Sequence, residues 1–287
     1  MRGTPRIPGA KERWSDYRKT ITDYVAQQIE PEDRILILGA GGCDDIDVEA
    51  LVRLGAEIYL ADVNVEAMNE VCLEIPSPHI HILEADFIGM TTPDYQDYLN
   101  SCCCGSKALD EWWDKYYYNI VHEKISMFKD VTTMMKHDKI ELFDMVLCFG
   151  LHSQLYINML RKTWMLTDAD EAVKREATRK IQSANLFIAE KFMDEINVLG
   201  KKMVLGLEYT GFAPDSNVES RILNQLNWAG TRGLYELGLS RVEGAYQMEQ
   251  YLLEINQEVK MIRDRQYTLW PFSSEKTYLM VIYWLEW

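Results

Sequence analysis

The sequence has no long apolar run. No stretch of about 18 uncharged apolar residues occurs in its 287 residues, so we expect no membrane-spanning helix and no membrane partner. The first residues include Arg2 and Arg6, but no apolar segment follows them, so we expect no secretory signal. Together these absences predict a cytoplasmic protein.

Basic residues are scarce relative to acidic ones. The chain has 30 Lys and Arg against 45 Asp and Glu, which gives a formal net charge of −15. Because nucleic-acid binding depends on basic side chains at the phosphates, this balance disfavours DNA and RNA as partners. The densest basic group, within residues 174–180, alternates with acids, which is typical of a solvated helix face.

Cysteine is too sparse for a disulfide scaffold, with six residues in the chain. Cys43, Cys72 and Cys148 lie in apolar stretches, where reduced core thiols are expected. The adjacent residues 102–104 are all cysteine, but they lack the C-x-x-C spacing or nearby histidines of a metal site. We therefore predict small residues in a loop there, and no metal.

The residues that are present describe a globular protein. Hydrophobic residues make up 47% and charged residues 26%, which excludes disorder and collagen-like repeats. The length favours one large domain, or one domain with an added cap. The prediction is an N-terminal helical cap segment over residues 1–30 and a main domain over 31–287, with a helical insertion at 88–140.

Short apolar runs alternate with helical patterns along the chain. Five of the runs have the character of buried parallel strands: 34–38, 57–61, 79–83, 142–149 and 202–208. The runs at 265–272 and 277–287 are joined by a short turn, which predicts an antiparallel hairpin. The predicted fold is α/β, a doubly wound Rossmann-like seven-stranded mixed sheet with this C-terminal hairpin and a helical cap.

Helices are expected between and beside these strands. Apolar residues recur at spacings of three and four over 10–29, and the insertion is expected to be helical from Leu109 to about Lys129. The other expected helices are 44–54, 65–73, 153–166, 170–199, 218–228 and 243–264.

The turn after the first strand has an unusual sequence. Ligands of open α/β sheets bind beyond the carboxyl ends of the strands. Gly39 and Gly41 begin a near match to G-x-G-x-x-G, but Asp44 occupies the last position and Asp45 follows it. Two carboxylates would repel a pyrophosphate at this helix N-terminus, while they tolerate a ligand with no phosphate and a positive charge. The alternative is a tight turn whose acids cap the next helix.

Acidic residues also follow the second and third strands. Asp62 lies 21 positions after Gly41, close to the spacing of about 20 typical of a ribose-binding acid. Asp86 ends the third strand, where its carboxylate could accept a hydrogen bond from an adenine amino group, and Phe87 could pack on the ring. Each of these residues also fits an ordinary capping or turn position.

With these motifs the chain resembles the class I S-adenosylmethionine-dependent methyltransferases, over roughly residues 34–287. The final hairpin is part of the resemblance, and dehydrogenase Rossmann domains lack it. The resemblance implies S-adenosylmethionine as cofactor, with Gly39 and Gly41 beside its methionine part and Asp62 on its ribose hydroxyls. It implies further cofactor contacts by Val63, Asp86, Phe87 and Phe149.

Two positions depart from the family pattern. Ile37 stands where an acid is common, and Cys43 stands where a third glycine is common. We therefore expect Asp44 or Asp45 to bind the amine of the ligand instead.

Residues near the other strand ends are candidates for the chemistry. Methyl transfer is an in-line displacement that depends mainly on positioning. His152 follows the fourth strand and is the candidate general base, although it also fits a helix-capping histidine. Glu208 and Tyr209, which end the fifth strand, are expected to bind substrate. Tyr17 belongs to an aromatic group that would cover the acceptor or form a packed cap core.

The function predicted from these residues is methyl transfer to a small-molecule or peptide acceptor. A non-catalytic S-adenosylmethionine-binding or scaffold protein is the first alternative. A nicotinamide-dependent oxidoreductase is the second, and Asp44 and the C-terminal hairpin disfavour it. The apolar end, Tyr283 to Trp287, fits either a buried strand or the contact of a homo-oligomer.

Overall fold

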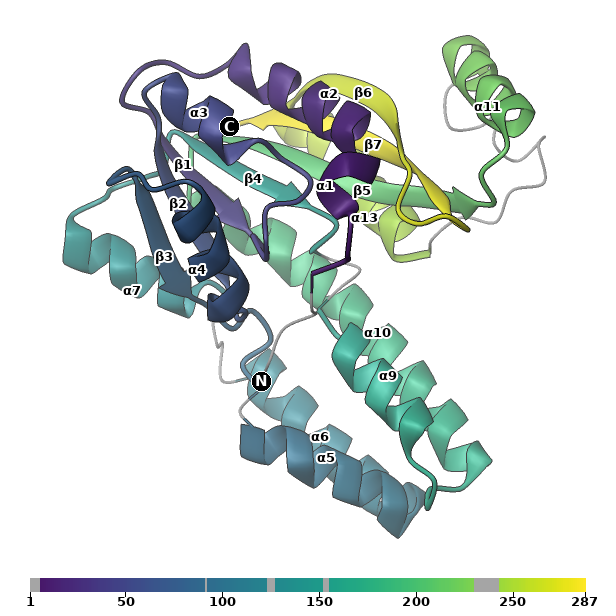
Figure 1. Ribbon diagram of the computed structural model, residues 1–287. Helices are drawn as coiled ribbons and strands as arrows, with labels where there is room; N and C mark the ends of the chain where they lie inside the picture. The colour runs from purple at the N-terminus through teal and green to yellow at the C-terminus, as the bar shows by residue number, and fades with distance from the viewer. Residues whose placement is uncertain (1–5, 91, 123–126, 152–154, 230–242) are drawn as a thin grey trace.

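A seven-stranded sheet forms the centre of the computed structural model, which describes residues 6–90, 92–122, 127–151, 155–229 and 243–287 (Figure 1). The strand order within these residues is β3-β2-β1-β4-β5-β7-β6. The strands are β1 (Arg34–Leu38), β2 (Glu57–Asp62), β3 (Ile80–Glu84), β4 (Met145–Phe149), β5 (Lys202–Phe212), β6 (Ile262–Trp270) and β7 (Thr277–Glu286). The first five are parallel and β7 is antiparallel to both of its neighbours, which confirms the predicted fold class.

Helices surround this sheet on both sides. They are α1 (Ala10–Arg13), α2 (Ser15–Ala26), α3 (Val48–Arg53), α4 (Val65–Glu74), α5 (Thr92–Cys104), α6 (Ser106–His122), α7 (Lys129–Asp138), α9 (Ile157–Met165), α10 (Glu171–Glu195), α11 (Ser216–Ala229) and α13 (Glu243–Val259), with a 3₁₀ turn at Ile196–Val198.

The two faces of the sheet pack into separate cores because side chains alternate along a strand. Ile35 and Ile37 join the core that α1 to α4 cover. Leu36 and Leu38 join the core that α7, α10 and α13 cover. Burial on both faces explains why the strands are continuously apolar in sequence.

The registers align the ends of the central strands. Leu38 at the end of β1 pairs with Ala61 of β2 on one side and with Cys148 of β4 on the other. The turns that follow β1, β2 and β4 therefore meet at one edge of the sheet. This edge positions the candidate site.

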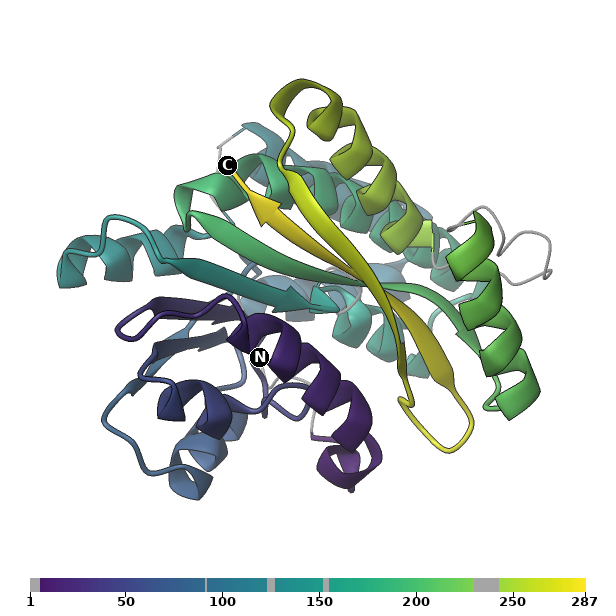
Figure 2. The same cartoon turned by 90° about the horizontal axis from the view of Figure 1, so that it is seen from above.

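The N-terminal helix and the insertion differ in detail from the prediction. The helical segment after residue 9 divides at Trp14 into α1 and α2, and α2 packs beside β6 (Figure 2). The insertion is already helical from Thr92, because Pro93 is compatible with a first helical turn. Residues 102–104 are therefore the last turn of α5 and not a loop, which corrects the prediction, and Gly105 with φ +100° follows.

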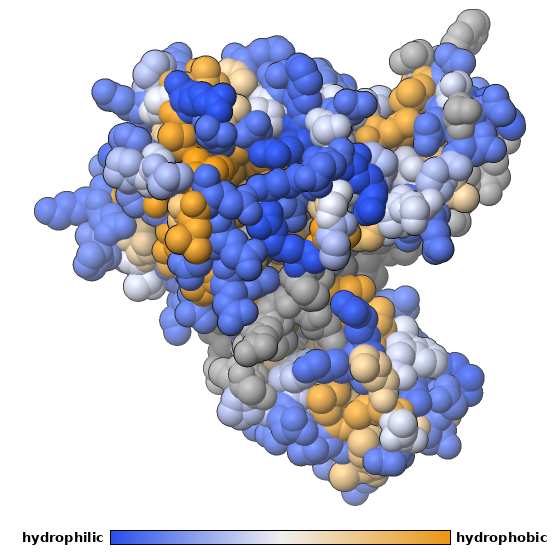
Figure 3. Space-filling model, in the orientation of Figure 1, coloured by the Kyte–Doolittle hydropathy of each residue, from blue (hydrophilic) through white to orange (hydrophobic). Residues whose placement is uncertain are grey.

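Four of the helices form what we call the helical arm: α5, α6, α9 and α10. They pack on one another through the contacts of α5 with α6, α9 with α10, and α6 with α10. The arm extends away from the sheet (Figure 1), and in Figure 3 it forms a separate lobe on which apolar and polar residues are mixed. The insertion therefore forms this arm together with later helices, and the division into cap segment and main domain stays a prediction.

In the described residues no helix has both the length and the apolar character needed to cross a membrane. The same residues contain no group of three or more His, Cys, Asp or Glu side chains that could hold a metal ion.

Candidate functional site

A cavity of about 270 Å³ lies at the carboxyl ends of the parallel strands. Its walls come from the turns after β1, β2, β3 and β4, from the end of β5, from the N-terminal segment and from the β6–β7 connection. The volume approaches that of the smaller ligand pockets of proteins, which begin at about 300 Å³. The cavity lies at the place where open α/β sheets bind ligands.

The turn after β1 is fixed to its neighbours by its backbone. The amides of Gly39 and Ala40 donate to the carbonyl of Ala61, at 2.8 and 3.2 Å. Gly39 has φ +69°, and a Cβ there would lie 2.9 Å from Cδ1 of Leu151. Both conditions require glycine at this position.

Asp62 connects the turns after β1 and β2. Its Oδ2 accepts the N–H of Gly41 at 3.0 Å, and its Oδ1 accepts the N–H of Asn64 at 2.7 Å. Burial raises the pKa of Asp62, and these backbone donors limit the rise. A third backbone amide, that of Val63, also bonds this carboxyl. Because a carboxylate has about four acceptor positions, Asp62 keeps capacity for a further donor, such as a ligand hydroxyl.

Asp86 and Phe87 form the wall after β3. Oδ1 of Asp86 accepts the amides of Ile88 and Gly89 at 3.0 and 3.2 Å, and burial raises the pKa of this carboxyl. The buried Phe87 ring packs edge-on against Phe128. The turn is also tied to the helical arm by the hydroxyl of Tyr116, which donates to the carbonyl of Ile88 at 3.0 Å.

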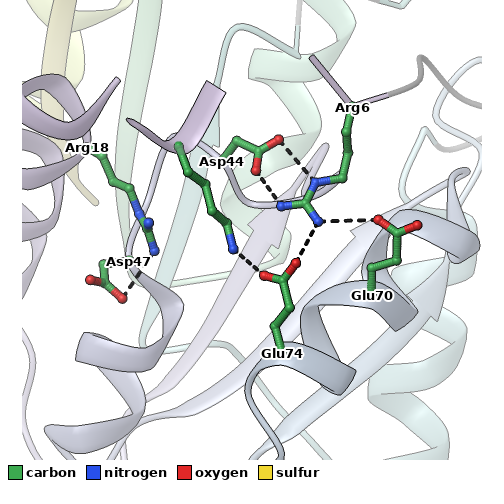
Figure 4. A network of polar contacts seen from close by, with 7 residues as sticks. Arg6, Arg18, Asp44, Asp47, Glu70 and Glu74 are labelled. Carbon is green, nitrogen blue, oxygen red and sulfur yellow. Dashed lines mark hydrogen bonds and ion pairs between the residues drawn. The ribbon is translucent and has the colours of Figure 1, made fainter. Parts of the chain in front are cut away.

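Arg6 closes the wall at the start of the chain (Figure 4). Its guanidinium donates to both carboxylate oxygens of Asp44, with Nη2 to Oδ1 at 2.5 Å and Nε to Oδ2 at 3.3 Å. Nη1 reaches Glu74 and Glu70 on α4 at 3.0 and 3.3 Å, and Lys11 also pairs with Glu74. Asp44 is therefore neutralised within the protein.

Asp45, the next residue, has a different environment. Burial raises the pKa of Asp45 to about 6; the neighbouring Asp44 adds to the rise, while a backbone hydrogen bond and Arg18 oppose it. Arg18 itself pairs with Asp47 at 3.3 Å (Figure 4). Asp45 thus lines the cavity as a carboxyl whose ionised form a bound cation would favour.

The ends of β4 and β5 bring a glycine, an aromatic ring and an acid together. Gly150 has φ +63°, and a Cβ there would lie 2.9 Å from Oε1 of Glu208. A Cβ on Gly206 would lie 2.6 Å from Cδ1 of Phe149, so that ring lies over the bare backbone of β5. Glu208 is 3% exposed, yet it lines the cavity.

Three rings form what we call the aromatic wall: Trp14, Trp270 and Phe272. Trp14 lies 4.9 Å from Trp270 in edge contact and is stacked with Phe272 at 5.9 Å between centroids. The indole N–H of Trp14 donates to the carbonyl of Phe272 at 3.2 Å. The start of α2 is thereby fixed to the β6–β7 connection beside the cavity.

Most of the sequence-predicted site residues line this one cavity. They are Gly39, Gly41, Asp44, Asp62, Val63, Asp86, Phe87, Phe149 and Glu208. His152, the candidate base, lies outside the described residues.

Tyr17 and Tyr209 were predicted to contact the substrate, but neither side chain lines the cavity. Tyr17 is buried behind the aromatic wall, stacked on Trp270 at 5.4 Å. Tyr209 follows Glu208 on β5 and packs in the core on the α10 and α13 side, because adjacent strand residues point to opposite faces.

Other wall residues carried little signal in the sequence. Arg6 precedes any periodic segment, and Trp270 and Phe272 belong to the hairpin, more than 250 residues after Trp14. The helical arm adds apolar residues near the starts of α5 and α9: Met90, Tyr95, Leu155 and Met159.

Comparison with known proteins adds little beyond the fold. No family model matches the chain, and no curated protein matches its sequence. Among solved structures, the magnesium protoporphyrin IX methyltransferase of Synechocystis PCC 6803 with bound SAH is 12% identical, with a TM-score of 0.39, over 98% of this chain and 90% of that one. Aeropyrum pernix fibrillarin in complex with S-adenosyl-L-methionine is 10% identical, with a TM-score of 0.36, over 94% and 76%. The plantazolicin methyltransferase BpumL with SAH is 11% identical, with a TM-score of 0.34, over 96% and 85%.

The strand order and the antiparallel β7 are those that the predicted fold requires, and this chain has a Rossmann-like, seven-stranded mixed sheet.

Proposed function

We propose that the protein transfers a methyl group from S-adenosylmethionine to a small-molecule or peptide acceptor. The observation that carries the proposal is Asp62, whose carboxylate joins the Gly41 turn to the start of α4 at the edge of the cavity. In this position the carboxylate keeps acceptor capacity for a ligand hydroxyl, while the glycine turn lets a ligand approach the backbone.

The charge of the cavity supports a ligand that lacks phosphate. Of the residues that the structure describes, five carboxylates line it, those of Asp44, Asp45, Asp62, Asp86 and Glu208. Among the described wall residues Arg6 is the basic one, and its guanidinium already pairs with Asp44. A pyrophosphate would meet uncompensated negative charge at this helix start, whereas a sulfonium with an amino group would meet favourable charge.

The wall residues fit S-adenosylmethionine in named positions. Asp62 would hold the ribose hydroxyls, and Val63 and Phe87 would contact the adenine with Asp86 at its amino group. Asp45 would pair with the amine, since Asp44 is occupied by Arg6. When bound, the cofactor supplies a methyl group on a positively charged sulfur, ready for in-line displacement.

The remaining wall residues position the acceptor and exclude water. Phe149 and the aromatic wall give the cavity an apolar side, which strengthens the electrostatic effect of the nearby carboxylates. Glu208 faces this side and would orient the acceptor. For a hydroxyl or thiol acceptor, His152 remains the proposed base.

Calorimetry with S-adenosylhomocysteine and with NAD tests the proposal. We expect micromolar binding of S-adenosylhomocysteine and none of NAD, and Asp62→Asn should weaken the binding at least about tenfold through the lost hydroxyl contacts. Asp144→Asn is the matched control, because Asp144 also accepts a strand-end amide, that of Arg34 at 3.0 Å, but lies outside the cavity wall.

A preference for NAD, or equal effects of the two substitutions, would contradict the proposal. An acceptor screen that follows S-adenosylhomocysteine production then separates an enzyme from a non-catalytic cofactor-binding protein. Binding without turnover on any amine, hydroxyl or thiol acceptor would indicate the latter.

A further inference from the structure

The proposed cofactor contacts do not use Glu208 or the aromatic wall, although both belong to the cavity. Glu208 comes from β5 and faces the turn after β4, whereas the cofactor positions come from the turns after β1, β2 and β3. The backbone accommodates this acid, because a Cβ on Gly150 would clash with Oε1 of Glu208. The acceptor side of the cavity therefore contains a buried carboxylate.

The rings of the aromatic wall border the same cavity. Trp14 is 6% and Trp270 8% exposed, and both line it. The rings of Trp270 and Phe272 meet edge to face at 5.1 Å, so the wall is rigidly packed. Tryptophan faces attract cations most strongly among aromatic side chains, and the attraction grows when water is excluded.

The wall and the acids are close in space. Tyr17, which stacks on Trp270, has a pKa that burial raises well above its usual value, and the charges of Asp45 and Glu208 raise it further. Within the part of the chain that the structure describes, the hydroxyl of Tyr17 and the indole N–H of Trp270 have no hydrogen-bond partner. Negative charge and buried polar groups thus gather here, and the only basic wall residue among those described, Arg6, is bound to Asp44.

We propose that the methyl acceptor is an amine, bound as its ammonium ion between Glu208 and the aromatic wall, and that its nitrogen receives the methyl group. The inference rests on the proposed function and specifies its substrate class. Cation–π attraction and the carboxylate both favour the ammonium, while a carboxylate or phosphate acceptor would be repelled by the acidic cavity.

The transfer then needs a deprotonation step. An ammonium nitrogen has no lone pair, so one proton must first pass to a carboxylate of the cavity. The freed lone pair forms the new N–C bond while the C–S bond breaks and its electron pair stays on sulfur. The product is an N-methylammonium ion, and the proton on the carboxylate is released to water.

Three probes with the same phenyl and two-carbon framework separate charge from shape: 2-phenylethylamine, 2-phenylethanol and phenylacetate. Their binding is measured by calorimetry on the full chain saturated with S-adenosylhomocysteine. We expect the amine to bind at least about tenfold tighter than the alcohol, and phenylacetate to bind more weakly than both. This ranking in the unaltered protein does not depend on any variant folding.

Two substitutions assign the preference to residues. Glu208→Gln should remove the advantage of the amine over the alcohol, and Trp14→Leu should reduce it. Glu249→Gln is the matched control: Glu249 is also buried, at 2% exposed, and accepts a hydrogen bond from Tyr283, but it is not part of the cavity wall. This control should leave the ranking unchanged.

Equal binding of all three probes, or tightest binding of phenylacetate, would overturn the inference if S-adenosylhomocysteine still binds. Retention of the amine preference in Glu208→Gln would overturn the role of that residue. Failure of S-adenosylhomocysteine to bind would instead contradict the proposed function itself.

Discussion

Arg6 and Asp44 are joined by two hydrogen bonds although 38 positions separate them in the sequence. The bidentate contact fastens the start of the chain over the turn after β1. It also leaves no room for a side chain at Gly42, where a Cβ would lie 2.5 Å from Nε of Arg6. The N-terminal segment is therefore fixed to the turn after β1 and forms part of the cavity wall.

Arg6→Gln should destabilise the protein by about 1–2 kcal/mol, because it breaks a partly buried, charge-assisted pair and leaves Asp44 without its partner. Thermal unfolding should show a lower Tm by a few degrees. S-adenosylhomocysteine binding should weaken as well, since the turn that contacts it loses its fastening.

Arg53→Gln provides the control for this substitution. Arg53 pairs with Glu49 one turn away on the exposed face of α3, a kind of contact that contributes little. A Tm change as large as that of Arg6→Gln would show that the Arg6–Asp44 pair stabilises the protein no more than this exposed pair does.

Asp45 should make stability depend on pH in an unusual direction. Its pKa is raised to about 6 in the folded protein, above its ordinary value, so the folded state binds more protons than the unfolded state between about pH 4 and 6. This contribution to stability is lost as pH rises through that window. Asp45→Asn should therefore gain stability relative to the unaltered protein, by about 1–3 kcal/mol between pH 4 and pH 7.

Urea unfolding of the two proteins at each pH measures this difference, and taking the difference cancels the other carboxyls that titrate in the same range. A constant difference across the range would show that the pKa of Asp45 is the same in the folded and unfolded states.

Ligand binding should show the opposite dependence on pH. A cation at Asp45 favours the ionised carboxylate, so S-adenosylhomocysteine, whose amine is positively charged, should bind tighter as pH rises from 5 to 7. Calorimetry should show this increase in the unaltered protein and a flatter profile in Asp45→Asn. Parallel profiles would place the amine elsewhere in the cavity.

Gly150→Ala should be more damaging than Gly105→Ala. Both residues have positive φ, +63° and +100°, so each substitution costs about 1–2 kcal/mol of backbone strain. Gly105 has no atom within 4 Å of the added Cβ, whereas Gly150 has Oε1 of Glu208 at 2.9 Å. Denaturant unfolding should show the larger loss at Gly150, and amine binding should weaken only there; equal losses would mean that Glu208 moves aside freely.

The thiols should differ sharply in reactivity. Cys103 and Cys104 are exposed at the end of α5, while Cys43 and Cys148 are buried and burial raises their pKa. Brief treatment with iodoacetamide followed by mass spectrometry should find label on the exposed pair in native protein, and on all of these residues in urea. Rapid native labelling of Cys148 would mean that the end of β4 opens readily.

The sheet was predictable because its signals are local. The buried strands are apolar on both faces, and glycine or an acid ends each run, so β1 and β4 were placed to within a few residues. The helix over residues 92–104 was missed because its amphipathic pattern is weak and three consecutive cysteines obscure it. The division of the first helix at Trp14 leaves no sequence signal, since both halves keep the same apolar spacing.

The candidate site was predictable where function depends on position along a strand. The acids Asp62 and Asp86 follow strand ends, so topology alone brings them to one cavity. The fastening by Arg6 and the aromatic wall depend on contacts between distant segments, and no periodic pattern encodes such contacts. Tyr209 is a further example, because one step along β5 decides whether a side chain faces the cavity or the core.

The helical arm gives the two halves of the cavity separate origins. The turns after β1, β2 and β3 supply one half, while the segments leading into α5 and α9 supply Met90, Tyr95, Leu155 and Met159 to the other. Exchange of the helical arm between related sequences would not alter the turns that face the nucleoside. It would change the surface that contacts the acceptor. Natural variation in acceptor choice, and any engineered change in it, should therefore concentrate in the helical arm and around Glu208 and the aromatic wall, and spare the turns after β1, β2 and β3.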